Sequence, residues 1–171
     1  MNVNFDKYQG TGNDFIIIDN RKLDFPKEDS SIISSFCNRN LGIGADGLIL
    51  LENENDVDFR MVYFNADGKE SSMCGNGGRC IVHYAKRQNI IKDKAAFIAI
   101  DGIHNATIEG DDVSLSMKDV NNIELSEDYA YLNTGSPHYI LWCSDLSTLN
   151  IIDKAREIRY NKRFAKEGTN V

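Results

Sequence analysis

The 171-residue sequence has few of the residues that build disulfide frameworks or metal sites. It contains four cysteines and three histidines, and no two cysteines form a Cys-x-x-Cys pair. The cysteines are scattered along a chain long enough to form a core without cross-links, which argues against a disulfide framework. The usual spacing of structural zinc ligands is also missing. We therefore expect neither disulfides nor a bound metal.

Positive charge and long apolar runs are also scarce. The chain carries 26 acidic and 19 basic residues, so its net charge of −7 lacks the basic face that nucleic-acid binding needs. No apolar run approaches the roughly 18 residues of a membrane span. Residues 1–7 have neither the basic flank nor the apolar core of a signal peptide. We therefore expect a cytoplasmic protein that binds neither nucleic acid nor a membrane.

The segment 70–84 carries the strongest chemical signal. Cys74 stands directly before a Gly-Asn-Gly run that opens into a helical spacing of residues. Small residues let a ligand approach the main chain, and a helix start supplies unpaired N–H groups that would hold a carboxylate. The same field favours the thiolate form of Cys74. The segment predicts a nucleophile or proton-transfer base beside a carboxylate cradle. The alternative is a cysteine that only packs a loop.

Alternating and helical patterns predict a chain of mixed α and β structure. Strands are expected at 5–8, 15–19, 48–52, 57–64, 96–101, 103–108, 113–117, 129–133 and 139–142, and helices at 30–38, 76–88 and 151–160. The acidic stretch 119–128 is the best linker candidate, so we expect domains at 1–118 and 119–171. The ending Gly168-Thr169-Asn170-Val171 reads as a turn entering a strand. We expect the chain to be the front part of a longer protein.

Three loops have polar or glycine-rich patterns that invite a ligand. Asn13 lies in the turn 9–14 between predicted strands, where its amide could bind a polar group. Asn65 closes a predicted strand just before the Cys74 loop, although an Asn in a turn needs no ligand to explain it. The glycines at 42 and 44 suggest a dinucleotide fingerprint, but the third Gly is misplaced and no strand precedes them. We expect a loop there, without a cofactor.

Several motifs, in order along nearly the whole chain, resemble those of diaminopimelate epimerase. They are Gly10-x-Gly12-Asn13-Asp14-Phe15, Gly42-Ile43-Gly44-Ala45-Asp46-Gly47, Phe64-Asn65-Ala66-Asp67-Gly68, Cys74-Gly75-Asn76-Gly77-Gly78-Arg79-Cys80, Gly135-Ser136-Pro137-His138 and Gly168-Thr169-Asn170-Val171. The block that begins at Cys74 is the most specific. Their collinear order makes chance agreement very improbable.

The resemblance implies an α+β fold of two similar domains, the second incomplete here. Each domain would be a curved, largely antiparallel sheet wrapped around a central helix, with the active site in the cleft between the domains. It also implies epimerisation of LL- and meso-2,6-diaminopimelate on the lysine and cell-wall route, without pyridoxal phosphate or metal. One cysteine thiolate would remove the substrate's α-proton while a second cysteine protonates the opposite face. The family further suggests a homodimer.

The resemblance assigns roles residue by residue. The first catalytic cysteine falls on Cys74, and the histidine expected to tune the thiol's acidity falls on His138. The substrate-binding positions are Asn13, Asn65, Gly75, Asn76 and Asn170. His83 and His104 match no motif and are expected to be structural.

Two positions depart from the family pattern. Many members have Gln where this chain has Gly47, and Asn where it has Ser136. Both changes remove a side-chain amide near the substrate, which leaves the contacts with its distal end open.

The family's second catalytic cysteine follows the motif at which this sequence ends. Cys80 and Cys143 stand in the wrong motifs to replace it, so we expect the isolated 171-residue chain to be inactive. One alternative is a racemase of another amino acid, such as histidine. Another is a non-catalytic binding or dimerisation segment. A Cys74–Cys80 redox pair is disfavoured because residues six apart across a helix start have poor disulfide geometry.

Overall fold

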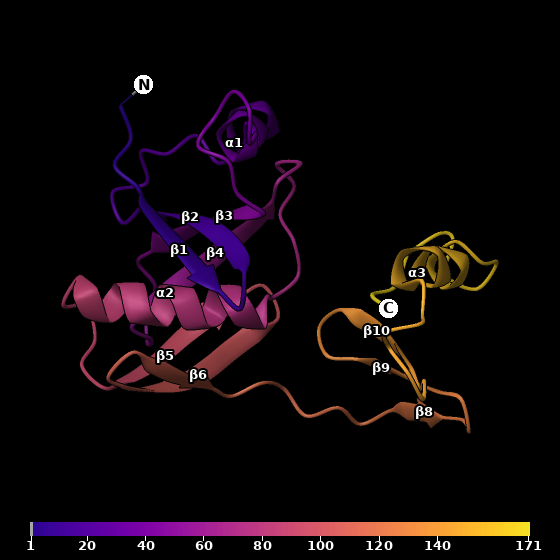
Figure 1. The fold of residues 1–171 in the computed structure, drawn as a ribbon. Coiled ribbons are helices and arrows are strands. Elements are labelled where there is room, and N and C mark those ends of the chain that lie inside the picture. The colour runs from indigo at the N-terminus through magenta and orange to yellow at the C-terminus, as the bar shows by residue number, and fades with distance from the viewer. Residues whose placement is uncertain (1) are drawn as a thin grey trace. The chain divides into compact units, whose positions relative to one another are not determined.

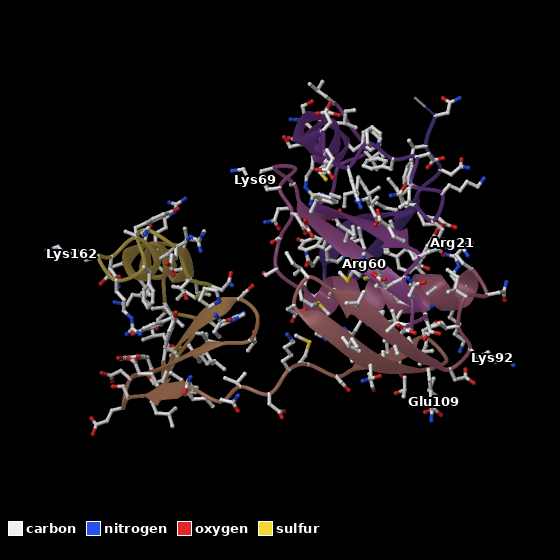
Figure 2. All side chains as sticks on the ribbon, turned by 180° about the vertical axis from the view of Figure 1, so that it is seen from behind. Arg21, Arg60, Lys69, Lys92, Glu109 and Lys162 are labelled. Carbon is white, nitrogen blue, oxygen red and sulfur yellow. The ribbon has the colours of Figure 1, made fainter. Side chains whose placement is uncertain are left out.

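The computed structural model describes residues 2–171, and the chain divides into two compact units (Figure 1). Unit 1 comprises Met1–Met117 and unit 2 comprises Lys118–Val171. Charged side chains such as Lys69, Lys92 and Glu109 extend outward from unit 1, as expected for solvated groups (Figure 2).

Within its described residues, unit 1 is built on a seven-stranded sheet whose strands follow one another in chain order. They are β1 (Asp6–Gly10), β2 (Asn13–Asp19), β3 (Gly47–Glu52), β4 (Phe59–Asn65), β5 (Lys94–Ala99), β6 (Gly102–Glu109) and β7 (Asp112–Leu115). The pairs β2–β3 and β4–β5 are parallel, and the other neighbours are antiparallel. Helix α1 (Ser30–Cys37) connects the first parallel pair and α2 (Gly75–Arg87) the second. The strands curl around α2 (Figure 1).

The sheet of unit 1 has a buried core on each face. Ile81, Val82 and Ala85 of α2 belong to one apolar cluster with residues of the strands, and Ile33 and Cys37 of α1 belong to the other. Strand β2 contributes to both clusters, because Phe15 and Ile17 face the α2 cluster while Ile16 and Ile18 face the α1 cluster. The β-branched run in β2 is therefore buried on both faces, as its sequence predicts.

Unit 2 contains a three-stranded antiparallel sheet and one helix among its described residues. The strands are β8 (Ile123–Leu125), β9 (Tyr129–Asn133) and β10 (Pro137–Leu141), and the helix is α3 (Ile151–Arg159). Phe164 is buried against the rings of Tyr131 and Tyr139, with centroids 5.2 and 5.8 Å away. Strand β8 lies inside the stretch that the sequence predicted to be a linker. That prediction is wrong for 123–125, because three exposed residues are too few to show a strand pattern.

The β1–β2 turn is tighter than its sequence suggests. Gly10 pairs directly with Asn13, so only Thr11 and Gly12 form the loop, and both have positive φ (55° and 85°). This is the geometry of a two-residue turn that matches the twist of a hairpin. Asn13 is consequently the first residue of β2, where the sheet holds its main chain.

Two glycines with nearly equal φ provide a test of how the turn after β4 is packed. Gly68 (φ 83°) and Gly12 (φ 85°) both adopt a conformation that costs an alanine about 1–2 kcal/mol. A Cβ at Gly68 would lie 2.1 Å from the Ser30 carbonyl oxygen, whereas one at Gly12 would meet nothing within 4 Å. We expect Gly68→Ala to lower the free energy of unfolding by at least about 2 kcal/mol more than Gly12→Ala. Urea denaturation of both variants measures this difference. Equal losses of unfolding free energy would contradict the close packing of Gly68 against Ser30.

Candidate active site

The strand register brings several of the predicted site residues to one edge of the sheet. Strand β2 begins at Asn13, β3 begins at Gly47 and β4 ends at Asn65. Gly47 pairs with Phe15 on one side and with Asn65 on the other. Asn13 and Asn65, which are far apart in the sequence, therefore lie on neighbouring parts of the same edge.

Cys74 stands immediately before α2 at this edge. Its main chain is extended (φ −109°, ψ 116°), and its carbonyl oxygen accepts the N–H of Gly78 at 2.8 Å, which begins the helix. Its side chain caps no main-chain N–H, so the thiol is not used to satisfy the helix start. The half-buried Sγ lies 3.7 Å from Oδ1 of Asn13 and donates to it. The first N–H groups of α2 have no acceptor within the helix.

The amides of Asn13 and Asn76 connect the helix start to the sheet. Asn76 Nδ2 donates to Asn13 Oδ1 at 3.4 Å, and Asn13 Nδ2 donates to Asp46 Oδ2 at 2.8 Å. Asn76 Oδ1 accepts hydrogen bonds from the Arg79 guanidinium and from the Thr11 hydroxyl, the latter at 3.2 Å. The β1–β2 turn, the loop before β3 and the first turn of α2 are thus joined by side-chain hydrogen bonds.

A compact set of charges holds the carboxylate end of this network. Arg39 donates to Asp14 Oδ1 and to Asp46 Oδ1, both at 2.7 Å, and Lys7 donates to Asp14 Oδ2 at 2.7 Å. The hydrogen bond from Arg39 is the main reason why the pKa of Asp14 is held well below its usual range. The Asp14 N–H also donates to Asp46 Oδ2 at 3.2 Å. Asp46 is therefore restrained at both carboxylate oxygens.

Tyr63 occupies the space that a side chain at Gly47 would fill. A Cβ at Gly47 would lie 2.5 Å from Tyr63 Cε2 and 2.5 Å from the Phe64 carbonyl oxygen. The ring also packs edge-on against Phe15, with centroids 5.9 Å apart. Burial, and to a smaller extent the nearby Cys74, raise the pKa of Tyr63 to about 12. The space beside Gly47 is therefore filled by a neutral phenol.

The glycines at the start of α2 differ in how much space surrounds them. A Cβ at Gly78 would lie 2.6 Å from Met73 Cε and 2.8 Å from Leu115 Cδ2, so the ends of these two side chains would have to shift to admit it. A Cβ at Gly75 would meet its nearest atoms, in Arg79 and Met117, at the ordinary distances of 3.7 and 3.8 Å. Packing therefore does not require glycine at position 75, which leaves its main chain open to a ligand.

The four cysteines are free, and their surroundings differ. Cys37 and Cys80 are 3% and 4% exposed, and burial raises the pKa of each thiol to about 11. Cys143 is exposed in unit 2, and Cys74 is partly exposed beside Asn13. Cys74 is the thiol that combines access to solvent with polar partners.

The remaining predicted residues lie together in unit 2. His138 of β10 forms an isolated bridge with Asn170, and the N–H of Tyr139 donates to the Asn170 carbonyl oxygen at 2.7 Å. His138 Nδ1 lies 2.8 Å from the Ser136 carbonyl oxygen, so this nitrogen carries a hydrogen that it donates. The lone pair of a neutral His138 is therefore on Nε2.

Residues 2–171 contain no group of three or more His, Cys, Asp or Glu side chains arranged to hold a metal ion. Over the same residues, every helix is too short or too polar to cross a membrane.

Comparison with known proteins identifies the relatives of this chain. A sequence model of diaminopimelate epimerase matches residues 5–123. The diaminopimelate epimerase of Flavobacterium psychrophilum is 54% identical over 96% of this chain. The chain belongs to the diaminopimelate epimerase family. The diaminopimelate epimerases of Aquifex aeolicus and Chlorobaculum tepidum are 36% and 39% identical over 99% and 95% of the chain. The chain spans 65%, 67% and 66% of the length of these three relatives.

Solved structures support the predicted fold. A hydroxyproline epimerase from Agrobacterium vitis has a TM-score of 0.60 at 12% identity, covering 91% of this chain and 55% of that protein. A PhzF-family phenazine biosynthesis protein from Bacillus anthracis has a TM-score of 0.55 at 18% identity, covering 81% and 54%. At these identities the likeness concerns the fold alone. It confirms the diaminopimelate-epimerase-like fold expected from the family motifs.

The structure adds three residues to which sequence reasoning gave no role. Asp46 and Arg79 lie inside the quoted motifs, where Asp46 contacts Asn13 and Arg79 contacts Asn76. Tyr63 lies outside the motifs. Residues of these types occur at many surface positions, so the strand register and the hydrogen bonds are needed to show that they lie at the site. The structure groups Asn13, Asn65, Cys74, Gly75 and Asn76 in unit 1, and His138 with Asn170 in unit 2.

The burial of the cysteines generates a labelling prediction. Treatment of the folded protein with iodoacetamide at pH 8 should modify Cys74 and Cys143 but leave Cys37 and Cys80 unmodified. The latter two are buried and have pKa values near 11, so they offer very little thiolate at this pH. Peptide mass spectrometry reports each site, and labelling in denaturant is the positive control. Alkylation of Cys80 as fast as Cys74 in the folded protein would contradict this assignment.

Proposed function

We propose that the protein containing this chain interconverts LL- and meso-2,6-diaminopimelate by proton transfer at two cysteines. This activity would serve lysine and cell-wall precursor synthesis, without pyridoxal phosphate or metal. The observation that carries the proposal is the placement of Cys74 at the start of α2, beside the amides of Asn13 and Asn76. Membership of the family supplies the substrate.

The proposed role of the α2 start is to hold the substrate's α-carboxylate. The N–H groups of Gly75 and Asn76 are the first of the helix, and Gly75 presents open main chain. An amino acid's α-proton is very weakly acidic, so negative charge that develops toward the carboxylate must be stabilised in the transition state. Donors already in place at a helix end provide that stabilisation without reorganisation.

Cys74 is proposed to act on one face of the substrate's α-carbon. As thiolate it would take the α-proton and become a thiol, leaving a carbanion. The thiol of a second cysteine, which the family supplies from its other domain, would then protonate the opposite face and become the thiolate. The proton count is unchanged and the α-carbon is inverted. Such a residue must exchange its proton readily in both directions.

His138 and Asn170 are proposed to complete the substrate site from the second domain. The tautomer imposed by the Ser136 carbonyl leaves Nε2 of His138 as a proton acceptor, which suits a partner of a catalytic thiol. Asn170 Nδ2 donates to the Pro137 carbonyl oxygen at 3.2 Å, which orients its amide beside His138. We propose Asn65 as a further substrate contact because it lies at the same edge as Asn13.

We also propose the wider context that the family suggests. The first domain would be 1–118, carrying Cys74, and 119–171 would begin the second domain. The four free thiols support a reducing, cytoplasmic location. A homodimer is the proposed assembly, and light scattering on the purified complete gene product tests it.

The direct test is stereoinversion by the complete gene product. Incubation with LL-diaminopimelate in D2O should give the meso isomer with deuterium at the inverted carbon. Replacing Cys74 by Ala should lower the rate by about a hundredfold or more, since a positioned acid–base group contributes on that scale. Cys143→Ala removes an exposed thiol and is the matched control, expected to keep the wild-type rate. Undiminished inversion by Cys74→Ala would contradict the proposed role of Cys74.

The same assay decides between the proposed substrate and another amino acid. Gly47 has no side chain and Tyr63 fills the space beside it, which is the observation that favours a changed substrate. A panel of L-amino acids that includes histidine is compared with LL-diaminopimelate by kcat/KM. A higher value for another amino acid would replace the proposed substrate. Absence of exchange with every member of the panel would support a non-catalytic role.

Gly75 permits a test of the carboxylate cradle that separates binding from stability. We expect Gly75→Ala to raise KM for diaminopimelate about tenfold, because the added methyl group would intrude where the carboxylate meets the main chain. The free energy of unfolding should stay the same or rise by up to about 1 kcal/mol, since alanine suits a helix better than glycine. Gly78→Ala is the matched variant in the same helix. It should gain less stability than Gly75→Ala, because the ends of Met73 and Leu115 must shift, while KM stays near the wild-type value. A raised KM for Gly78→Ala and an unchanged KM for Gly75→Ala would exclude the cradle.

A further inference from the structure

The two amides beside Cys74 lie between a cation and an anion. The Arg79 guanidinium donates to Asn76 Oδ1, Asn76 Nδ2 donates to Asn13 Oδ1, and Asn13 Nδ2 donates to Asp46 Oδ2. Every hydrogen bond in this series points in the same direction, from Arg79 toward Asp46. Asp46 forms its ion pair with Arg39, and it is the two amides that connect Arg79 to Asp46 by hydrogen bonds.

The charges at the two ends determine which way each amide faces. A side-chain amide can turn by 180°, which exchanges its oxygen and nitrogen, and only its partners decide between the two states. An ionised carboxylate only accepts hydrogen bonds and a guanidinium only donates them. Asp46 therefore requires Nδ2 of Asn13, and Arg79 requires Oδ1 of Asn76. The middle contact is a hydrogen bond when both requirements are met, and turning one amide alone would place like atoms together.

We propose that Asp46 and Arg79 are positioning residues of the active site, which fix the orientation of the Asn13 and Asn76 amides so that Asn13 Oδ1 faces the Cys74 thiol. For its importance in catalysis this inference rests on the proposed function of Cys74 as a proton-transfer residue. With the observed orientation, Asn13 Oδ1 accepts the S–H of Cys74 at 3.7 Å. The turned amide would instead present N–H donors to the sulfur and would direct the thiol proton elsewhere.

The surroundings of Asp46 suit a fixed end point. Its Oδ1 accepts from Arg39 at 2.7 Å, and its Oδ2 is shared by Asn13 and the Asp14 N–H. At the other end, the Thr11 hydroxyl contacts Asn76 Oδ1 at 3.2 Å but can either donate or accept. Only Arg79 discriminates between the two orientations of Asn76.

The orientation can be measured without substrate. In the 15N-labelled complete gene product, the side-chain NH2 groups of Asn13 and Asn76 should each give a single set of resonances. Asp46→Asn keeps the shape but can donate as well as accept, and Arg79→Met removes the donor. The double variant should split or broaden the resonances of both asparagines, whereas each single variant should change mainly the asparagine that the mutated residue contacts. Arg79→Lys keeps a group that only donates, and combined with Asp46→Asn it should give the single set.

Kinetics should show the same coupling. We expect Asp46→Asn and Arg79→Met each to lower kcat about tenfold, the scale of one hydrogen bond to a charged group, with a smaller change in KM. The double variant should lose more kcat than the product of the two single losses, since either charge alone can still orient both amides through the middle hydrogen bond. Arg79→Lys should recover most of kcat. Thermal unfolding of each variant measures any loss of stability separately.

Different results overturn different parts. Unchanged resonances of both asparagines in the double variant would overturn the inference, as would a loss of kcat in the double variant no greater than the product of the two single losses. If Asp46→Asn does not fold because Arg39 loses its partner, the comparison of Arg79→Met with Arg79→Lys still decides. Coupled resonances in a protein without epimerase activity would leave the amide orientation in place and refute the proposed function.

Discussion

The candidate site depends on the main-chain N–H groups at the start of α2. They have no acceptor within the helix, so they are available to an anion only if the fold keeps other acceptors away from them. Cys74 satisfies this condition because its side chain donates to Asn13 and caps no N–H. The curled sheet supplies the rest, since its register brings the ends of β2, β3 and β4 beside this helix start.

This constraint explains why residues with similar chemistry have different tasks. A side chain at Gly78 would displace the ends of two core side chains, while Gly75 is free of that restriction. Cys80, one and a half turns further along α2, is buried and its raised pKa keeps it a neutral thiol. Distance from the helix start, together with burial, separates the reactive positions from the packing positions.

Sequence reasoning located the elements because their signals are local. The β-branched run in β2, the helix after Cys74 and the hairpin of β6 and β7 follow from spacing and turn residues, and the structure confirms them within a few residues. The motifs likewise indicated Asn13, Cys74 and Asn76. Strand β8 was missed because its exposed residues carry no burial pattern. The packing of Tyr63 into the space beside Gly47 was also out of reach, because it depends on the approach of two strands across their pairing.

Sequence alone also cannot reveal the orientation of the side chains that it identifies. Asn13 is a donor and an acceptor at once, so its presence in a motif leaves open whether the thiol meets an oxygen or a nitrogen. The answer comes from Asp46, which is 33 residues away in the sequence and is itself held by Arg39. Charges that would ordinarily be regarded as solvated surface groups thus determine how neutral amides face the sulfur.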